Sequence, residues 1–391
     1  MNEIHTMYQP RSRTLRNLAI AAATGFGVVV AGLFLAPERI WPAVLLANYY
    51  VLTLALAGTV FVALMHVSRA GWSTVFRRIP ESMSTILPVC FGVMLLMVFG
   101  LSTLYEWSHP GAVAADPLLQ GKEAWLNVPF FLIRIVLYFA IWIGFSSILR
   151  RNSRLQDSSG DERLTRRNMR FSALFIVLFA LSFWLASTDW LMSLEPHWYS
   201  TIFSVYNFSG LILSGIATII VILIMLRRRG VFGDLIRDSH LHDLGKLLFA
   251  FSTFWMYIWF SQYMLTWYAN IPEFTVYYIG REQGGWLTFT WLNVVFNWGI
   301  PFVTLLSARA KKAEGLLLKV AIIVLIGHWI DLFWMIAPPF MPAAPVIGVW
   351  EIAPLVTALA LFFFFTLRAL SRGNVLPVQD PTLVESLHYH A

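Results

Sequence analysis

The sequence predicts an all-α integral membrane protein with ten transmembrane helices, arranged as two four-helix bundles plus flanking helices, with both termini cytoplasmic. Hydrophobic residues make up 58% of the 391-residue chain, charged residues make up 13%, and the mean hydropathy is +0.68. Ordinary soluble domains carry about 25% charged residues. Most of this chain must therefore face lipid or other apolar helices, and the apolar runs and the positions of the basic residues support the same class.

Ten apolar runs are long enough to cross a bilayer, which takes roughly 17–25 helical residues. They are Asn17–Ala36, Ala43–Val67, Thr85–Tyr105, Trp125–Leu149, Phe171–Met192, Thr201–Leu226, Gly245–Trp267, Gly285–Ser307, Gly315–Ala337 and Val346–Leu367. The first run is longer than the apolar part of a signal peptide, about 7–15 residues, and Pro37 follows it directly. We therefore expect this run to be retained as a span.

Basic residues are concentrated in alternate loops. The N-terminal arm, the C-terminal tail and every second loop hold 24 of the 28 Lys and Arg residues, and the other four are Arg39, Lys122, Arg134 and Arg281. This distribution follows the positive-inside rule and places both termini in the cytoplasm. The net charge of +7 therefore reflects membrane topology, and no soluble domain is left that could bind nucleic acid.

The expected organisation has five parts. They are a cytoplasmic N-terminal arm (1–16), spans one to four (17–149), a basic cytoplasmic loop (150–170), spans five to ten (171–370) and a cytoplasmic tail (371–391). We expect the loop to be mobile and the tail, which contains two prolines, to be extended and exposed. Spans two to five and six to nine run in matching directions, which is compatible with two four-helix bundles.

Titratable side chains are expected to concentrate at the outer ends of the spans. The segment Asp189–Thr201 holds two carboxylates, a histidine, two tryptophans and a tyrosine between two long apolar runs. In the predicted topology Arg134, Asp189, His328 and Asp331 lie in the outer halves of their spans, and Glu195, His197 and Glu273 lie near the same surface. A charge in hydrocarbon costs at least ~2.5–3.5 kcal/mol, so such residues usually pair or serve a pathway. The acids of the inner loops are mixed with arginines and are expected in water.

These residues predict a proton pathway. Burial raises the pKa of a carboxyl group toward neutrality, and the ordinary pKa of histidine is already near it, so both kinds of group can pass protons. We expect Asp189, His328 and Asp331 to form a buried relay, with Glu195, His197 and Glu273 at its exit and Arg134 holding one carboxylate ionised. The alternatives are a purely structural anchor, in which the same residues only pair and pack, and a secondary transporter, which would have interrupted helices in paired repeats.

No cofactor is expected to be held by this chain. Cys90 is the only cysteine, whereas an iron–sulfur cluster takes about four, and no C-x-x-C-H motif is present for covalent haem. His328 and Asp331 offer only two metal ligands, so no metal site is predicted. Nucleotide-binding motifs are also absent from the sequence. Energy for proton movement would therefore come from a partner or a gradient.

Three segments carry a resemblance to a known family: Asp189–Thr201, Trp259–Glu273 and His328–Trp334. They resemble the second, shorter NrfD-like (polysulfide-reductase-type) membrane subunits of bacterial alternative complex III, a quinol:cytochrome c oxidoreductase. The resemblance implies two four-helix bundles with flanking helices in the bacterial inner membrane. It also implies partners: a larger homologous NrfD-like subunit, a periplasmic iron–sulfur subunit, multihaem and monohaem cytochrome c subunits, and small membrane subunits.

In that family the larger neighbour is the better candidate for the site of quinol or menaquinol, and haem c and iron–sulfur clusters belong to partner subunits. The shorter subunit is associated with proton conduction or scaffolding. The resemblance therefore implies a respiratory membrane subunit without its own redox centre, which is not catalytic alone.

Overall fold

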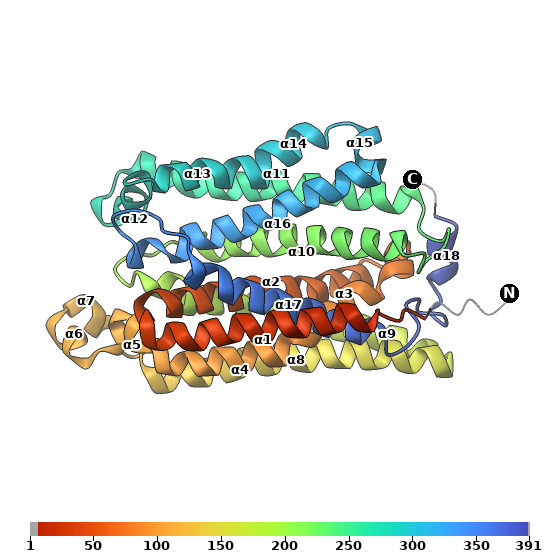
Figure 1. Cartoon of the computed structure of the whole chain (residues 1–391), viewed down its shortest axis with the longest axis horizontal. Coiled ribbons are helices and arrows are strands. Elements are labelled where there is room, and N and C mark those ends of the chain that lie inside the picture. Colours follow the sequence, from red (N-terminus) through yellow and green to blue (C-terminus); the bar gives the residue numbers. More distant parts are fainter. Residues whose placement is uncertain (1–6, 390–391) are drawn as a thin grey trace.

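Long helices run side by side along the greatest dimension of the molecule in the computed structural model, which describes residues 7–389 (Figure 1). The uninterrupted long helices are α1 (Ser12–Leu35), α2 (Pro37–Val67), α8 (Val128–Ser159), α9 (Glu162–Trp190), α10 (Phe203–Arg228), α11 (Asp238–Ala269), α16 (Glu314–Ile336) and α17 (Val349–Leu370). One segmented pass comprises α3 (Arg78–Met83), η2 (Ser84–Ile86), α4 (Leu87–Leu96), η3 (Met97–Gly100) and α5 (Leu101–Leu104). A second comprises α13 (Trp286–Val294), a π-helical turn η6 (Val295–Gly299) and α14 (Ile300–Thr304).

Short helices occupy the connections. They are η1 (Gly71–Phe76), η4 (Glu106–Ser108), α6 (Pro110–Ala115), α7 (Pro117–Lys122), η5 (Met192–Leu194), α12 (Pro272–Glu282), α15 (Ala308–Lys312), η7 (Pro338–Phe340) and α18 (Leu383–Leu387). Between residues 7 and 389 there is no strand, only an isolated bridge from Met7 to Asn374. The all-α class is confirmed.

Eight helical segments are long and apolar enough to cross a membrane. They are Ser12–Leu35, Pro37–Val67, Arg78–Leu104, Val128–Ser159, Glu162–Leu194, Phe203–Arg228, Glu314–Ile336 and Val349–Leu370. The protein is therefore a multi-pass membrane protein by helix length and composition. The other two predicted spans coincide with α11, in which Trp, Tyr, Ser and Gln lie between the aliphatic residues, and with the segmented pass α13–η6–α14.

Helices α2 and α10 form the centre of the molecule. In the most apolar stretch of each helix, 83% of the α2 residues and 94% of the α10 residues are buried, compared with 17% of the α1 residues. Helix α1 lies on the outside and packs on α17. α2 contacts α4 and α9, and α10 contacts α11 and α16. The two sets of neighbours also meet, because α10 contacts α9 and α2 contacts α16. Small residues allow α2 and α10 to cross closely: a β-carbon at Gly215 of α10 would lie 2.1 Å from that of Ala57 on α2.

Two expectations about the connecting segments were wrong. Residues 150–170 are mostly helical and do not form a long loop, because α8 continues to Ser159 and α9 begins at Glu162, with Gly160 in the left-handed region (φ 63°) at the turn. The tail is not exposed: Val375 and Leu376 are buried, and α18 packs against η1. The tail folds back onto the bundle because this removes its apolar side chains from water.

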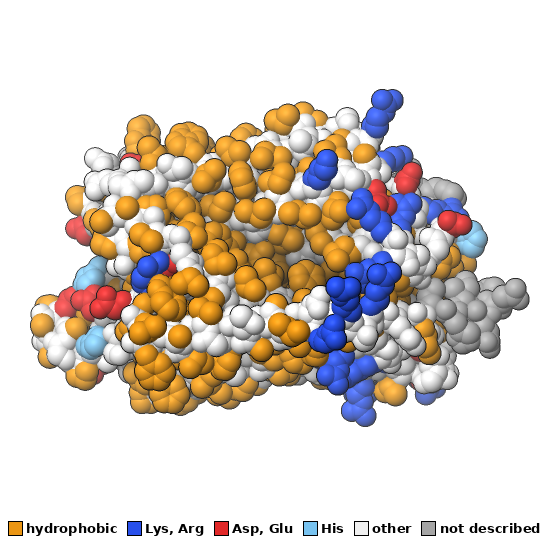
Figure 2. Space-filling view, viewed as in Figure 1, with side chains coloured by type: hydrophobic (Ala, Val, Ile, Leu, Met, Phe, Trp, Pro, Cys, Tyr) orange, Lys and Arg blue, Asp and Glu red, His pale blue; other side chains and the backbone are white. Residues whose placement is uncertain are grey.

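Charge divides the two ends of the bundle. On the face shown in Figure 2, Lys and Arg gather at one end of a broad apolar surface, where some acidic side chains lie among them, and a further group of Asp, Glu and His side chains lies at the other end. The start of α1 and α18 lie at the Lys- and Arg-rich end (Figure 1), which we call the basic end. The start of α2, the last turns of α9 and α12 lie at the other end, which we call the opposite end.

Candidate functional site

Asp331 on α16 is buried in the interior, and side chains from three other helices hold its carboxylate. Asn293 of α13 donates a hydrogen bond to Oδ1 at 2.7 Å, and the indole N–H of Trp255 on α11 donates to Oδ2 at 3.1 Å. The hydroxyl of Tyr206 on α10 also donates to Oδ1. Asp331 is only 1% exposed, so these donors replace the water that a carboxylate loses on burial.

The π-helical turn η6 orients one of these donors. Asn297 lies in the turn and donates from Nδ2 to Oδ1 of Asn293 at 2.7 Å, so the amide nitrogen of Asn293 faces Asp331. Ser252 of α11 donates to the carbonyl of Asn297 at 2.7 Å. Gly327 of α16 lets the helices approach, because a β-carbon there would lie 2.8 Å from Oδ1 of Asn297. π-turns inside α-helices are frequent at functional sites.

His328 precedes Asp331 by one turn of α16 and contacts α2. Its Nε2 lies 2.9 Å from Oγ1 of Thr53, and its ring packs on that of Tyr50 with 5.3 Å between centroids. The hydroxyl hydrogen of Thr53 goes to the carbonyl of Tyr50, so Nε2 of His328 is the donor in the first contact. Nδ1 therefore carries a lone pair, and it has no hydrogen-bond partner among residues 7–389.

Gly210 of α10 lies beside both titratable groups. A β-carbon at Gly210 would be 3.4 Å from Nδ1 of His328 and 3.6 Å from Oδ2 of Asp331. Nδ1 of His328 and Oδ2 of Asp331 therefore both lie beside Gly210. Proton transfer between them would need a single small bridging group such as a water molecule.

Asp189 forms a second, separate cluster at the end of α9. Arg134 of α8 donates from Nε to Oδ2 at 2.7 Å and from Nη2 to Oδ1 at 3.1 Å. Tyr138 and Trp125 each donate to the carboxylate at 2.8 Å, and the guanidinium also packs over the ring of Trp125, 4.4 Å from its centroid. Both charged residues are buried. Arg134 therefore pairs with Asp189, in a site that saturates both groups.

The structure does not bring the predicted relay residues together as one chain. Among the described residues, no hydrogen bond joins Asp189 to His328 or to Asp331. The three residues belong to two clusters on either side of α2.

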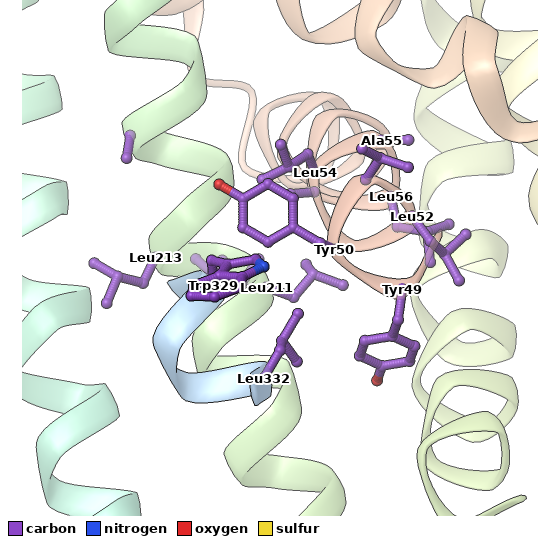
Figure 3. Close-up of a cluster of buried hydrophobic side chains, with 14 of the residues drawn as sticks. Tyr49, Tyr50, Leu52, Leu54, Ala55, Leu56, Leu211, Leu213, Trp329 and Leu332 are labelled. Atoms are coloured by element: carbon purple, nitrogen blue, oxygen red, sulfur yellow. The ribbon is translucent and has the colours of Figure 1, made fainter. Parts of the chain in front are cut away.

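Neutral side chains lie between the two clusters. The hydroxyl of Tyr49 is 3.2 Å from Oγ of Ser187, close to Asp189, and donates to Oδ1 of Asn207 at 3.3 Å. Figure 3 shows Tyr49 and Tyr50 leaving α2 in different directions, with Trp329 and Leu332 of α16 on the side of Tyr50. Adjacent tyrosines therefore serve different clusters.

Glu195 is held in an ion pair at the opposite end. Its Oε1 accepts from Nη2 of Arg281 at 2.6 Å. Arg281 is 1% exposed and also donates to the carbonyls of Trp334 and Met335 at 3.1 and 3.0 Å. Its guanidinium stacks on Tyr277, 3.4 Å from the ring centroid. This pair ties the segment after α9 to α12 and to the end of α16.

The other two predicted exit residues lie on the surface. The imidazole of His197 contacts the carboxylate of Asp116 through Nε2 and lies 3.9 Å from Glu106 through Nδ1. The hydrogen bond from His197, assisted by the backbone N–H of Leu118, lowers the pKa of Asp116. Glu273 is exposed in the first turn of α12. Glu195, His197 and Glu273 thus share one end of the molecule but form no common cluster in the described part of the chain.

The basic end also contains buried charges, contrary to the expectation that its acids lie in water. Arg78 pairs with Glu81 at 2.8 Å and with Asp157, and Arg77 pairs with Asp380 of the tail. Burial alone would raise the pKa of Asp380, but Arg77 and the hydrogen bonds from Thr382 outweigh it, and the net pKa is lowered. The folded tail covers these groups, which composition alone does not show.

Sequence reasoning missed several partners of the titratable groups. Tyr206, Thr53 and Tyr50 were not among the predicted site residues, although Tyr206 lies four residues before Gly210 on the same face of α10. The described residues include no group of three or more His, Cys, Asp or Glu that could hold a metal ion. No protein-family model matches the chain, and no curated protein matches its sequence significantly.

Proposed function

We propose that the protein is a membrane subunit of a respiratory complex that oxidises quinol and passes electrons to cytochrome c or another periplasmic acceptor. In this proposal it crosses the bacterial inner membrane ten times with both termini cytoplasmic. It carries a proton pathway, scaffolds the complex and has no redox centre of its own. Quinol or menaquinol, haem c and iron–sulfur clusters are placed in partner subunits, as the resemblance to alternative complex III implies.

One observation supports the proposed proton pathway: Nδ1 of His328 and Oδ2 of Asp331 both lie beside Gly210, within the buried interior. Purely structural polar groups in a membrane interior are expected to be satisfied by neighbouring groups. Asp331 is satisfied by three donors, but Nδ1 of His328 has no partner among the described residues. A titratable nitrogen with a free lone pair beside a carboxylate is suited to proton transfer.

In this proposal the relay consists of His328 and Asp331. Arg134, Tyr138 and Trp125 all donate hydrogen bonds to the carboxylate of Asp189, which leaves it no free position to exchange with a relay partner. We assign Asp189 and Arg134 to the scaffold. Protons that leave Asp331 would reach the opposite end, where Glu195, His197 and Glu273 are found.

The experiment is substitution of Asp331 by Asn in the assembled complex. We expect turnover or proton translocation to fall by at least about tenfold, because a positioned proton-transfer group contributes that much or more. Glu351→Gln is the matched control: Glu351 is a buried carboxylate on the flanking helix α17, paired with Arg39 at 2.7 Å. Its turnover should stay near wild type. Co-purification of c-type haem and the iron–sulfur subunit checks assembly. Unchanged rate and proton-to-electron ratio in D331N would refute the relay.

A purely structural anchor is the second candidate, and the saturated Arg134–Asp189 pair favours it. This role predicts that D331N lowers stability while leaving the turnover of the assembled complex unchanged. The same experiment therefore separates the two functions.

The transporter alternative expects interrupted helices at matching positions of two repeats. In the part of the chain that the structure describes, η2 and η3 interrupt the second pass of the group that starts with α2. The π-helical turn η6 interrupts the third pass of the group that starts with α10. These positions do not correspond, so the interruptions lend this alternative no support.

A further inference from the structure

A cavity of about 290 Å³ opens at the basic end, between α3, the last turns of α8 and the end of α17. Its charged lining consists of Arg78, Arg150, Arg154 and Arg372 together with Glu81 and Asp157. We call it the basic cavity. The volume is that of roughly ten water molecules at about 30 Å³ each, which is enough for a phosphate and part of a glycerol group.

Positive charge in the basic cavity is only partly compensated. Arg78 is buried and forms ion pairs with both acidic residues of the lining, with Glu81 at 2.8 Å and with Asp157. Arg150, Arg154 and Arg372 form no ion pair within residues 7–389. The cavity therefore presents an excess of guanidinium groups, and each carboxylate in its lining is paired with Arg78.

Two of these arginines lie close enough on α8 for their positive charges to repel each other. Arg150 and Arg154 are four residues apart, so they lie on one helix face, where like charges are destabilising. Backbone contacts hold them near the cavity: Arg150 donates to the carbonyl of Ser146 at 3.3 Å, and Arg154 donates to the carbonyl of Ala369 at 2.8 Å. A bound anion would relieve the repulsion and accept the remaining N–H groups.

The basic cavity lies where the lipid-facing surface ends. Arg150 directly follows the apolar run that ends at Leu149, and toward its start α8 exposes Ile133, Val136 and Leu137. Leu370 and Met7 supply apolar lining beside the arginines. Figure 2 shows Lys and Arg side chains bordering the apolar surface at this end. Phospholipid phosphates occupy this level of a bilayer, and basic pockets between transmembrane helices bind anionic headgroups.

We propose that the basic cavity binds the phosphate of an anionic membrane phospholipid, with Arg150, Arg154 and Arg372 as its ligands. A free phosphate would use the same guanidinium groups but would gain nothing from the apolar border. A lipid keeps its acyl chains against α8 while its headgroup enters the cavity. This site is independent of the proposed proton pathway, because it lies at the other end of the bundle and shares no residue with it.

The test uses the full-length chain, stripped of lipid in detergent and incubated with vesicles of equal parts phosphatidylglycerol and phosphatidylcholine. Native mass spectrometry then counts the lipids retained by wild type, by R150Q/R154Q/R372Q and by the single variant R372Q. The matched control R151Q/R163Q/R170Q removes three arginines near the same turn that do not line the cavity. Thermal unfolding of every variant checks the fold.

We expect wild type and the control to retain phosphatidylglycerol in preference to phosphatidylcholine. The cavity variant should bind phosphatidylglycerol at least about tenfold more weakly, since each basic residue near an anionic surface contributes roughly fivefold or more. The single variant R372Q should show an intermediate loss of phosphatidylglycerol binding. Its fold should be unaffected, because the side chain of Arg372 is exposed. Millimolar inorganic phosphate should not displace the lipid.

Equal lipid retention in the cavity and control variants would overturn the proposal. So would displacement of the lipid by inorganic phosphate, which indicates a site for a free anion. Binding of an acidic peptide by a wild-type chain that retains no anionic lipid would assign the cavity to a protein partner and likewise reject the lipid.

Discussion

The guanidinium of Arg134 donates two hydrogen bonds to the carboxylate of Asp189, at 2.7 and 3.1 Å, with both residues buried between α8 and α9. Trp125 and Tyr138 complete the shell of donors around the carboxylate. This pair joins two neighbouring helices at the opposite end and leaves neither charge uncompensated.

Removing one partner of this pair should be more harmful than removing both. Arg134→Met leaves the Asp189 carboxylate buried without its counter-charge, and we expect it to lower the free energy of unfolding by about 3–5 kcal/mol. The double variant R134M/D189L should be less destabilised than R134M, because no charge is left behind. Unfolding midpoints in detergent measure both. Strictly additive effects of R134M and D189L would show that the pair contributes no coupling energy.

A methyl group at Gly210 should separate proton transfer from stability. The new β-carbon would make ordinary contacts of 3.4 Å with His328 and 3.6 Å with Asp331, so the fold should survive G210A. It would lie beside both groups, and if the protein has the proposed function we expect turnover of the respiratory complex to fall roughly tenfold or more. Gly144→Ala, where nothing lies within 4 Å, is the control. Wild-type turnover in G210A would place the pathway elsewhere.

The crossing of α2 and α10 should depend on Gly215. A β-carbon there would lie 2.1 Å from the β-carbon of Ala57, so Gly215→Val forces the two central helices apart. Overpacking of this kind costs about 1–3 kcal/mol or more. The same substitution at Gly144 should be nearly neutral. Thermal unfolding of the purified variants measures the difference. A G215V protein as stable as wild type would contradict the close approach of α2 and α10.

The ion pair between Arg77 and Asp380 should make the docking of the tail sensitive to acid. Because the pKa of Asp380 is lowered in the folded protein, its stabilisation is complete above the unfolded value of about 3.9 and is lost as the pH falls through the folded pKa. Asp380→Asn should cost about 1.5–3 kcal/mol at pH 7 and much less in strong acid.

Limited proteolysis of the tail at pH 7 and at pH 3 measures this difference. Wild type should be protected at pH 7 and cleaved more readily in acid, whereas D380N should be cleaved at similar rates at both values. A D380N tail as well protected as the wild-type tail at pH 7 would show that α18 and its apolar neighbours hold the tail without the ion pair.

The membrane class and most span positions could be predicted because they depend on local composition. A run of about 20 apolar residues must be helical in lipid, whatever its neighbours are. The same locality made Asp331, His328, Asp189 and Arg134 conspicuous, since each interrupts such a run at an energetic cost. The predictions failed where an apolar signal was short, as in the tail, where Val375 and Leu376 are buried.

The sequence by itself determined that the protein is helical and membrane-embedded, and which ionisable side chains lie within its spans. Only the tertiary structure decided the partners of those side chains. Asp189 pairs with Arg134, whereas Asp331 takes its donors from α10, α11 and α13. The physical reason is that helical periodicity places residues on faces, but the rotation of each helix and its neighbours follow from close packing. Contacts such as that of Gly215 with Ala57 set this packing, and they join residues far apart in the chain.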